Sequence, residues 1–106
     1  MTEGDIKRTI QEYLELQRVS GVLYWDRLNS GSVLVRAGSK TYRLQLCREG
    51  TPDLMVITGK GLMFLEVKQE GKKPTKVQLD MHRELREHGA KVCVVHSLEE
   101  VIEVLK

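Results

Sequence analysis

The sequence predicts an α/β protein whose mixed β-sheet is flanked by helices. Apolar residues recur at helical spacing near the start of the chain, where Ile6, Ile10 and Leu14 mark one face of a helix. In the middle of the chain, two apolar runs at 54–57 and 62–68 are joined by a glycine turn, which is typical of a β-hairpin. A second helical pattern and a short apolar strand follow the hairpin. This order of elements predicts helices packed against one sheet.

Size and composition are those of one small domain. The chain has 106 residues and a formal net charge of +2, so we expect one domain over residues 1–106 that binds nucleic acid, if at all, through local basic clusters. Cys47 and Cys93 match no metal or redox spacing. No apolar stretch is long enough to cross a membrane, and the first residues do not resemble a signal peptide. We therefore expect a cytoplasmic protein with no membrane partner.

The first helix is expected to begin after Thr2, with Asp5 completing a capping-box-like start, and to end at residues 20–21. At 100° per residue, Glu3 falls within the apolar face, whereas Glu12 points away from it. An acid on the inward side needs a partner, so Glu3 is the better candidate site residue and Glu12 the weaker substitute. The alternative is that Glu3 only complements the dipole at the start of the helix.

Residues 22–28 are predicted to form a strand in which Tyr24 and Trp25 point to opposite faces. The polar loop 29–32 follows, and Arg27 beside it could contact a phosphate or simply be solvated.

A second hairpin is predicted from strands at 33–36 and 41–47 across a turn at 37–40. It is rich in basic residues, which could neutralise DNA phosphates or form a solvated strand face. These residues are Arg36, Lys40, Arg43 and Arg48.

The hairpin in the middle of the chain carries the most informative pattern. If Gly59 and Lys60 form its tip, counting outward brings Asp53 opposite Glu66, and like charges at directly opposed positions destabilise a sheet. A bound divalent cation would turn this repulsion into a site, because hard cations take carboxylate oxygens as ligands. Lys68 shares a face with Glu66 because side chains alternate along a strand. The alternative is a hairpin edge with these charges facing water.

The next helix is expected to begin after Thr75, with Gln78 at the capping-box position. Gln78, Met81, His82 and Leu85 share one face of this helix, so Gln78 faces inward near the helix start. Three lysines close to this end add positive potential near the site. They are Lys72, Lys73 and Lys76.

The last part of the chain is predicted to contain a strand and a helix. Gly89 ends the preceding helix, the apolar strand at 92–95 is expected in the centre of the sheet, and Ser97 caps a closing helix at 98–105. No second ligand lies at zinc spacing from any histidine, so we interpret all three as ordinary residues. They are His82, His88 and His96.

Pro52-Asp53 followed by Glu66-Val67-Lys68 resembles the signature of the PD-(D/E)XK nuclease superfamily, and the surrounding residues resemble its VRR-NUC branch, in the form of stand-alone phage and bacterial chains. The similar positions are Glu3, Trp25, Arg27, Gly31, Gly50 to Asp53, Glu66 to Lys68, Gln78 and Gly89. The resemblance implies a restriction-endonuclease-like core in helix–strand–strand–strand–helix–strand order. An extra hairpin and a C-terminal helix would be added to that core.

The resemblance also implies a metal-dependent DNA endonuclease. Asp53, Glu66 and the backbone carbonyl of Val67 would hold Mg²⁺ or Mn²⁺, and Glu3 would complete that site or hold a second ion. Lys68 would orient or help deprotonate the attacking water, and Gln78 would position that water or the phosphate.

Two other functions stay open at this point. One is a catalytically inactive DNA-binding module with the same fold, although Asp53, Glu66 and Lys68 are all present. The other is a metal-dependent enzyme acting on a different substrate. We expect the endonuclease to be a homodimer that prefers branched DNA such as four-way junctions, because one small domain carries one site and two strands must be cut.

Overall fold

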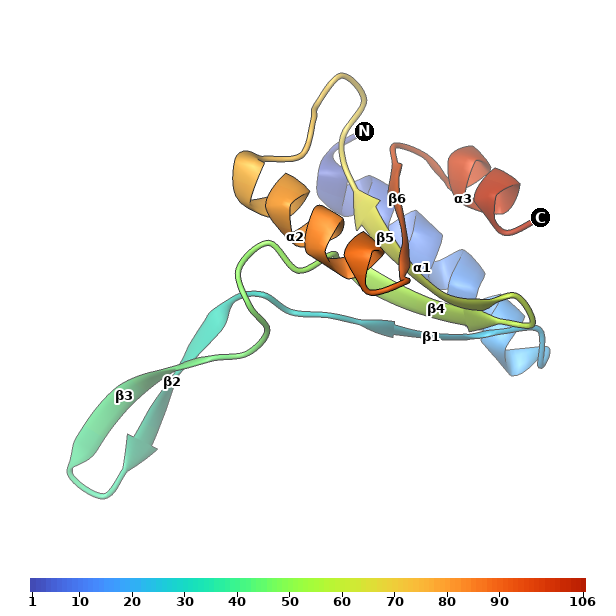
Figure 1. The fold of residues 1–106 in the computed structure, drawn as a ribbon. Helices are drawn as coiled ribbons and strands as arrows, with labels where there is room; N and C mark the ends of the chain where they lie inside the picture. Colours follow the sequence, from blue (N-terminus) through green and yellow to red (C-terminus); the bar gives the residue numbers. More distant parts are fainter.

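A computed structural model describes residues 1–106 and contains the helices and strands that the sequence predicts (Figure 1). Strand β1 is shorter than the predicted 22–28. In chain order the elements are α1 (Glu3–Val19), β1 (Tyr24–Arg27), β2 (Ser32–Ala37), β3 (Lys40–Gln45), β4 (Leu54–Thr58), β5 (Gly61–Val67), α2 (Lys76–Glu87), β6 (Lys91–Val95) and α3 (Leu98–Val104). None of the three helices is both long enough and apolar enough to cross a membrane.

Four strands form a mixed sheet in the order β1-β4-β5-β6. β1 and β4 pair antiparallel, as do β4 and β5, whereas β5 and β6 pair parallel. The expectation that residues 92–95 form a central strand is wrong, because β6 lies at the edge of the sheet. Its continuous apolar sequence has another cause: α2 packs against one face of β6 and α3 against the other.

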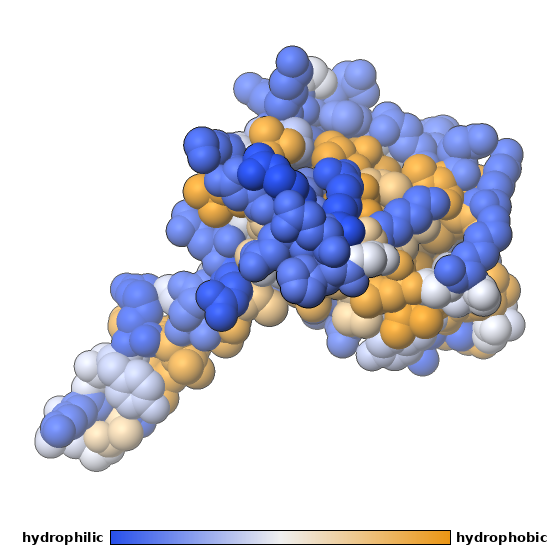
Figure 2. Space-filling view, viewed as in Figure 1, coloured by the Kyte–Doolittle hydropathy of each residue, from blue (hydrophilic) through white to orange (hydrophobic).

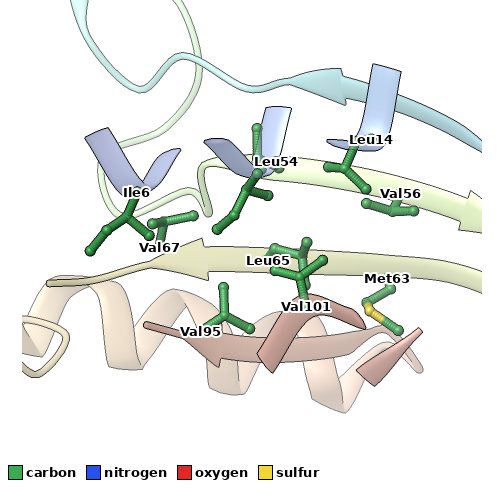
Figure 3. Packing of buried hydrophobic residues seen from close by; sticks show 10 residues of the cluster. Ile6, Leu14, Leu54, Val56, Met63, Leu65, Val67, Val95 and Val101 are labelled. Atoms are coloured by element: carbon green, nitrogen blue, oxygen red, sulfur yellow. The ribbon is translucent and has the colours of Figure 1, made fainter. Parts of the chain in front are cut away.

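The sheet lies between two helical layers. Helices α1 and α3 cover one face, while α2 lies across the other (Figure 1). The core fills the α1 side of the sheet, where Leu54 and Val56 of β4 face Leu65 and Val67 of β5 beneath the apolar face of α1 (Figure 3). Each of these four side chains is fully buried. The alternation predicted for β5 therefore holds, and Glu66 points to the opposite side, toward α2.

Local caps fix the starts of α1 and α2, which lie on opposite faces of the sheet. Thr2 accepts a hydrogen bond from the Asp5 amide, and the Asp5 side chain accepts one from the Thr2 amide. Thr75 and Gln78 form the same reciprocal pair at the start of α2. A capping residue of this kind stabilises a helix by about 1 kcal/mol. Both predicted helix starts are confirmed.

Strands β2 and β3 form a separate two-stranded sheet, which we call the arm (residues 32–45). The arm projects away from the body of the molecule (Figures 1 and 2). Gly38 adopts φ +64° in its turn, a conformation that glycine takes without steric penalty. Every residue of β3 is exposed. The sequence predicted this hairpin, but its local pattern did not reveal that it stands apart from the main sheet.

Candidate active site

The β4–β5 hairpin brings the two predicted acids together. Its ladder runs from Thr58 opposite Gly61 to Leu54 opposite Leu65, which is the predicted register. One step further along the same register lies Asp53 opposite Glu66. The Val67 amide donates a hydrogen bond to Asp53 Oδ2 over 2.8 Å, so the Asp53 side chain is held across the end of the hairpin.

Gly50 explains how the chain reaches Asp53. Its φ is +89°, and a Cβ atom at this position would lie 2.7 Å from the backbone carbonyl oxygen of Val77 in α2. Only glycine allows the backbone to approach the helix this closely. After the buried Pro52, the Asp53 carbonyl accepts a hydrogen bond from the Leu28 amide over 2.8 Å, which fixes the segment beside the end of β1.

Glu66 is almost fully buried, with 1% of its surface exposed. Burial raises the pKa of the Glu66 carboxyl to about 8, with further increases from its hydrogen bond to Asp53 and from the negative charge of Asp53. The positive charges of Lys68 and Lys7 oppose this shift. Without an added cation, the Glu66 carboxyl is therefore protonated at neutral pH. The alternative in which Glu66 faces water is wrong.

Lys68 and Glu3 lie together beside this pair. The Lys68 side chain is only 14% exposed, and its Nζ lies 4.0 Å from Glu3 Oε1. Glu12, in contrast, is exposed on another side of α1. The helical phase predicted from the sequence therefore brings Glu3, and not Glu12, toward the site.

Lys7 was not among the predicted site residues. Its Nζ lies 3.1 Å from Asp53 Oδ1, with both side chains partly buried. Lys7 follows Glu3 by one helical turn, so both project from the same side of α1. That spacing is a signal that the sequence contains. The prediction for this helix named only acidic residues and therefore did not include Lys7.

His82 also lies against the candidate site, a contact that the interpretation of it as an ordinary histidine did not include. It is fully buried, and its Nε2 lies 3.0 Å from Glu66 Oε1. Burial lowers the pKa of the His82 imidazole, and the positive charges of Arg86 and Lys68 lower it further, although Asp53 opposes them. The imidazole is therefore neutral. Its helical face, shared with Gln78, was visible in the sequence, but its distance to Glu66 depends on how α2 packs.

The two remaining histidines lie outside this cluster. His88 is exposed, and its Nδ1 is 3.1 Å from the Glu84 carbonyl oxygen of its own helix. His96 contacts Glu100 at the start of α3, with 3.3 Å between Nδ1 and Oε1. Neither histidine bonds to a predicted site carboxylate.

Gln78 faces inward at the start of α2, as predicted. Its side-chain Oε1 accepts a hydrogen bond from the backbone amide of Thr75 over 2.9 Å, and the backbone amide of Gln78 donates to Thr75 Oγ1 over 3.3 Å. These bonds complete the helix cap. The side chain makes no hydrogen bond to Asp53, Glu66 or Lys68.

An open cleft of about 630 Å³ borders Asp53, whereas Glu66 does not line it. Asp53, Lys7 and Arg27 all line it, so Arg27 lies in the same cleft as the predicted metal ligand Asp53. The remaining lining residues, almost all polar, are Gln11, Asp26, Leu28, Asn29 and Ser30. A polar cleft that contains Lys7 and Arg27 suits a phosphate backbone better than an apolar ligand.

The other predicted DNA contacts are exposed but divided between two places. The arm carries Arg36, Lys40 and Arg43, and the Arg43 guanidinium donates to Ser32 Oγ over 2.9 Å. Lys72 and Lys73 lie in the loop before α2. Lys76 lies in the first turn of α2 and pairs with Asp80 over 3.1 Å.

The donor atoms at the site fit a hard divalent cation. Asp53 and Glu66 carry carboxyl oxygens, and Mg²⁺ is commonly held by one or two carboxylates while its remaining positions keep water. The structure contains no group of three or more histidine, cysteine, aspartate or glutamate side chains that could hold a metal ion. The ammonium group of Lys7 on Asp53 shows that a positive charge already lies against this carboxylate.

Comparisons with known proteins identify the family of this chain. The family model described as the VRR-NUC domain matches residues 1–99. A solved structure described as a VRR_NUC domain is 27% identical, with a TM-score of 0.64, and the match covers 99% of this chain and 96% of that one. Among curated proteins there is no match. The chain therefore belongs to the VRR-NUC family, a nuclease-type domain of the PD-(D/E)XK superfamily.

Proposed function

We propose that this protein is a divalent-metal-dependent endonuclease that hydrolyses phosphodiester bonds in DNA. The observation that carries the proposal is the pairing of Asp53 with the buried Glu66 at the end of the β4–β5 hairpin, beside Lys68. Two carboxyl groups in contact, one of them buried, can both be ionised only next to a strong positive charge. Membership of a nuclease-type family and the polar cleft beside Asp53 support DNA as the substrate.

Asp53, Glu66 and the Val67 carbonyl would hold Mg²⁺ or Mn²⁺, with Glu3 reaching the ion directly or through water. When bound, such an ion lowers the pKa of a coordinated water and balances negative charge on the phosphate. Ionisation of Glu66 follows from the same arrangement, because a nearby cation opposes the burial and the repulsion that raise its pKa.

Lys68 would orient the attacking water and balance charge that develops on the phosphate. Its ammonium group is a compact charge on a largely buried side chain, so its position changes little. Lys7 and Arg27 line the cleft and would bind phosphate oxygens on either side of the reacting bond. Gln78 would position the water or the phosphate through its side-chain nitrogen, because its side-chain oxygen accepts a hydrogen bond in the helix cap.

The exposed basic residues would extend the contact with DNA beyond the cleft. Phosphate neutralisation supplies most of the affinity that does not depend on sequence, and its strength falls as salt rises. The arm contributes Arg36, Lys40 and Arg43, and the region before α2 contributes Lys72, Lys73 and Lys76.

We further propose that the active form is a homodimer that prefers four-way junctions or other branched DNA. One chain carries one site, and a two-fold axis would present two such sites to opposite strands. The arm exposes apolar side chains that a second copy could cover, among them Val33 and Leu44, which pair across its two strands and share one face. Exposed apolar residues that lie together often mark protein interfaces.

A metal titration with purified protein tests the chemistry. We expect a supercoiled plasmid and a four-way junction to be cut only when Mg²⁺ or Mn²⁺ is added, and Asp53→Asn to abolish cleavage. Asp80→Asn is the matched control, because Asp80 is an exposed acid on α2 away from the paired carboxylates. Cleavage by Asp53→Asn at the wild-type rate would refute the site. DNA binding without cleavage by the wild-type protein would instead indicate an inactive binding module.

The assembly is tested separately. Light scattering at micromolar concentration should give twice the 12.1 kDa chain mass. Cleavage by a monomer at that concentration would rule out the dimer as the active form. Equal rates on a junction and on a linear duplex of matched sequence would remove the proposed preference for branched DNA.

A further inference from the structure

The contact between His82 and Glu66 joins α2 to the candidate site on β5. His82 projects from α2 onto the face of β5 that carries Glu66, and its Nε2 lies 3.0 Å from Glu66 Oε1. Both side chains are buried, at 0% and 1% exposure. His82 does not line the cleft beside Asp53, so it has no direct access to a substrate there.

This pair is an unusual choice for the interior of a small domain. Burying an imidazole and a carboxyl group is unfavourable unless each finds a hydrogen-bond partner, and an apolar pair of similar volume is often as stable or more stable. Position 82 lies between Met81 and Leu85 on the inward face of α2, where an apolar residue would pack well. A packing role alone therefore does not account for a histidine.

The surroundings of His82 indicate the direction of the hydrogen bond. Its Nδ1 is buried and has no hydrogen-bond partner. In a neutral imidazole one ring nitrogen carries the hydrogen, and a buried N–H without a partner is rarer in proteins than an acceptor without one. The hydrogen therefore belongs on Nε2, which donates to Glu66 Oε1.

We propose that His82 is a positioning residue for Glu66. Its Nε2–H holds one carboxyl oxygen on the α2 side, so that the second oxygen is directed toward Asp53 and the metal position. The role resembles that of a group that orients a metal ligand from outside the ligand set, and loss of such a group weakens metal binding by roughly 10–100-fold. This inference deepens the proposed function and rests on the same site.

Calorimetry with Mn²⁺ in the absence of DNA tests the role directly. We expect His82→Leu, which removes the donor at similar volume, to weaken Mn²⁺ binding by roughly 10–100-fold. His82→Gln keeps an N–H donor at a similar reach and should recover most of the affinity. His88→Gln is the control on the same helix, because His88 is exposed, and it should bind as the wild type does. Equal affinity in His82→Leu and the wild type would overturn the proposal.

Nitrogen-15 NMR of the metal-free wild-type protein gives a second readout that needs no folded variant. We expect the neutral tautomer of His82 with its hydrogen on Nε2. A hydrogen on Nδ1 would mean that His82 accepts from Glu66, and it would overturn the inference even if His82→Leu failed to fold.

Mn²⁺ calorimetry and the DNA cleavage assay together separate this inference from the proposed function. Loss of Mn²⁺ affinity in His82→Leu, in a protein that cuts no DNA, would leave His82 as a positioning residue and refute the endonuclease. Metal-dependent cleavage by a protein whose His82→Leu variant binds Mn²⁺ normally would do the reverse. A wild-type protein that binds no Mn²⁺ would refute both.

Discussion

The two hairpins of this protein share the same sequence pattern, two strand-forming runs joined by a turn, but they differ in how they pack against the rest of the molecule. The β4–β5 hairpin is joined to strands on both sides and lies between two helical layers, so Leu65 and Glu66 are both buried although they point to opposite faces. The arm pairs only with itself, and all of β3 is exposed. Tertiary packing, and not the hairpin pattern, decides which of the two can hold charged groups at fixed distances.

This difference separates two tasks. The proposed chemistry would require groups held with little freedom, and the ladder, the Val67 amide and His82 restrict Asp53 and Glu66 in this way. Binding a polyanion requires only accessible charge, which an exposed arm with Arg36 and Lys40 supplies. The comparison predicts that equal substitutions in the two hairpins have unequal effects.

Replacement of a lysine in each hairpin should give the largest contrast. Lys68→Ala is expected to reduce the rate of DNA cleavage by roughly 10³-fold, about 4 kcal/mol in the barrier, because it removes a preorganised charge at the site. Mn²⁺ binding should remain, because an ammonium group is not a metal ligand.

Lys40→Ala at the tip of the arm is the matched control and should change the rate less than twofold. Single-turnover cleavage and calorimetry on both variants check the result. Loss of Mn²⁺ binding in Lys68→Ala would mean that Lys68 supports the structure of the site and not its chemistry.

Replacement of a leucine in each hairpin should separate their contributions to stability. Leu65→Ala is expected to lower the free energy of unfolding by about 2–5 kcal/mol, because a fully buried side chain leaves a cavity in the core. Leu44→Ala should change it by less than about 0.5 kcal/mol, because Leu44 is 46% exposed. Urea unfolding of both variants measures the difference. Equal losses would show that the arm is packed against something in solution, such as a second copy.

The buried carboxyl of the β4–β5 hairpin should make the stability of the metal-free protein depend on pH. The pKa of Glu66 is about 8 in the folded protein against 4.5 for an ordinary glutamate, so the folded state binds more protons between these pH values. The free energy of unfolding is therefore expected to fall as pH rises from about 5 to 8, by about 2–4 kcal/mol.

Urea unfolding at a series of pH values, in the presence of a chelator, measures this slope. Glu66→Gln should remove most of it, whereas Glu12→Gln, an exposed acid on α1, should leave it intact. The same dependence on pH in the wild type and in Glu66→Gln would mean that Glu66 is ionised without a metal.

The sequence was sufficient where the determining interactions are local. The register that opposes Asp53 to Glu66 follows from a two-residue turn, and the cap formed by Thr75 and Gln78 spans three residues. It was insufficient where packing decides. His82 reaches Glu66 only because α2 crosses that face of β5, and an apolar run such as 92–95 reflects helices on both faces as readily as neighbouring strands.

The arm itself should produce the smallest effect, and on binding alone. Replacing Arg36, Lys40 and Arg43 with glutamine should weaken DNA binding and reduce the slope of log affinity against log salt by up to about 3, because each phosphate contact contributes about 0.9. The cleavage rate at saturating DNA should stay within about twofold, because none of these residues borders the cleft at Asp53.

A control variant with glutamine at three exposed basic positions away from the arm removes the same total charge. These positions are Arg83, Lys91 and Lys106. Fluorescence anisotropy over a series of salt concentrations compares the two. If both variants lose the same slope, the arm contributes only to the overall charge and makes no specific contact with DNA. A changed cleavage rate at saturation in the arm variant alone would mean that the arm helps to position the reacting bond, and the division of tasks between the hairpins would fail.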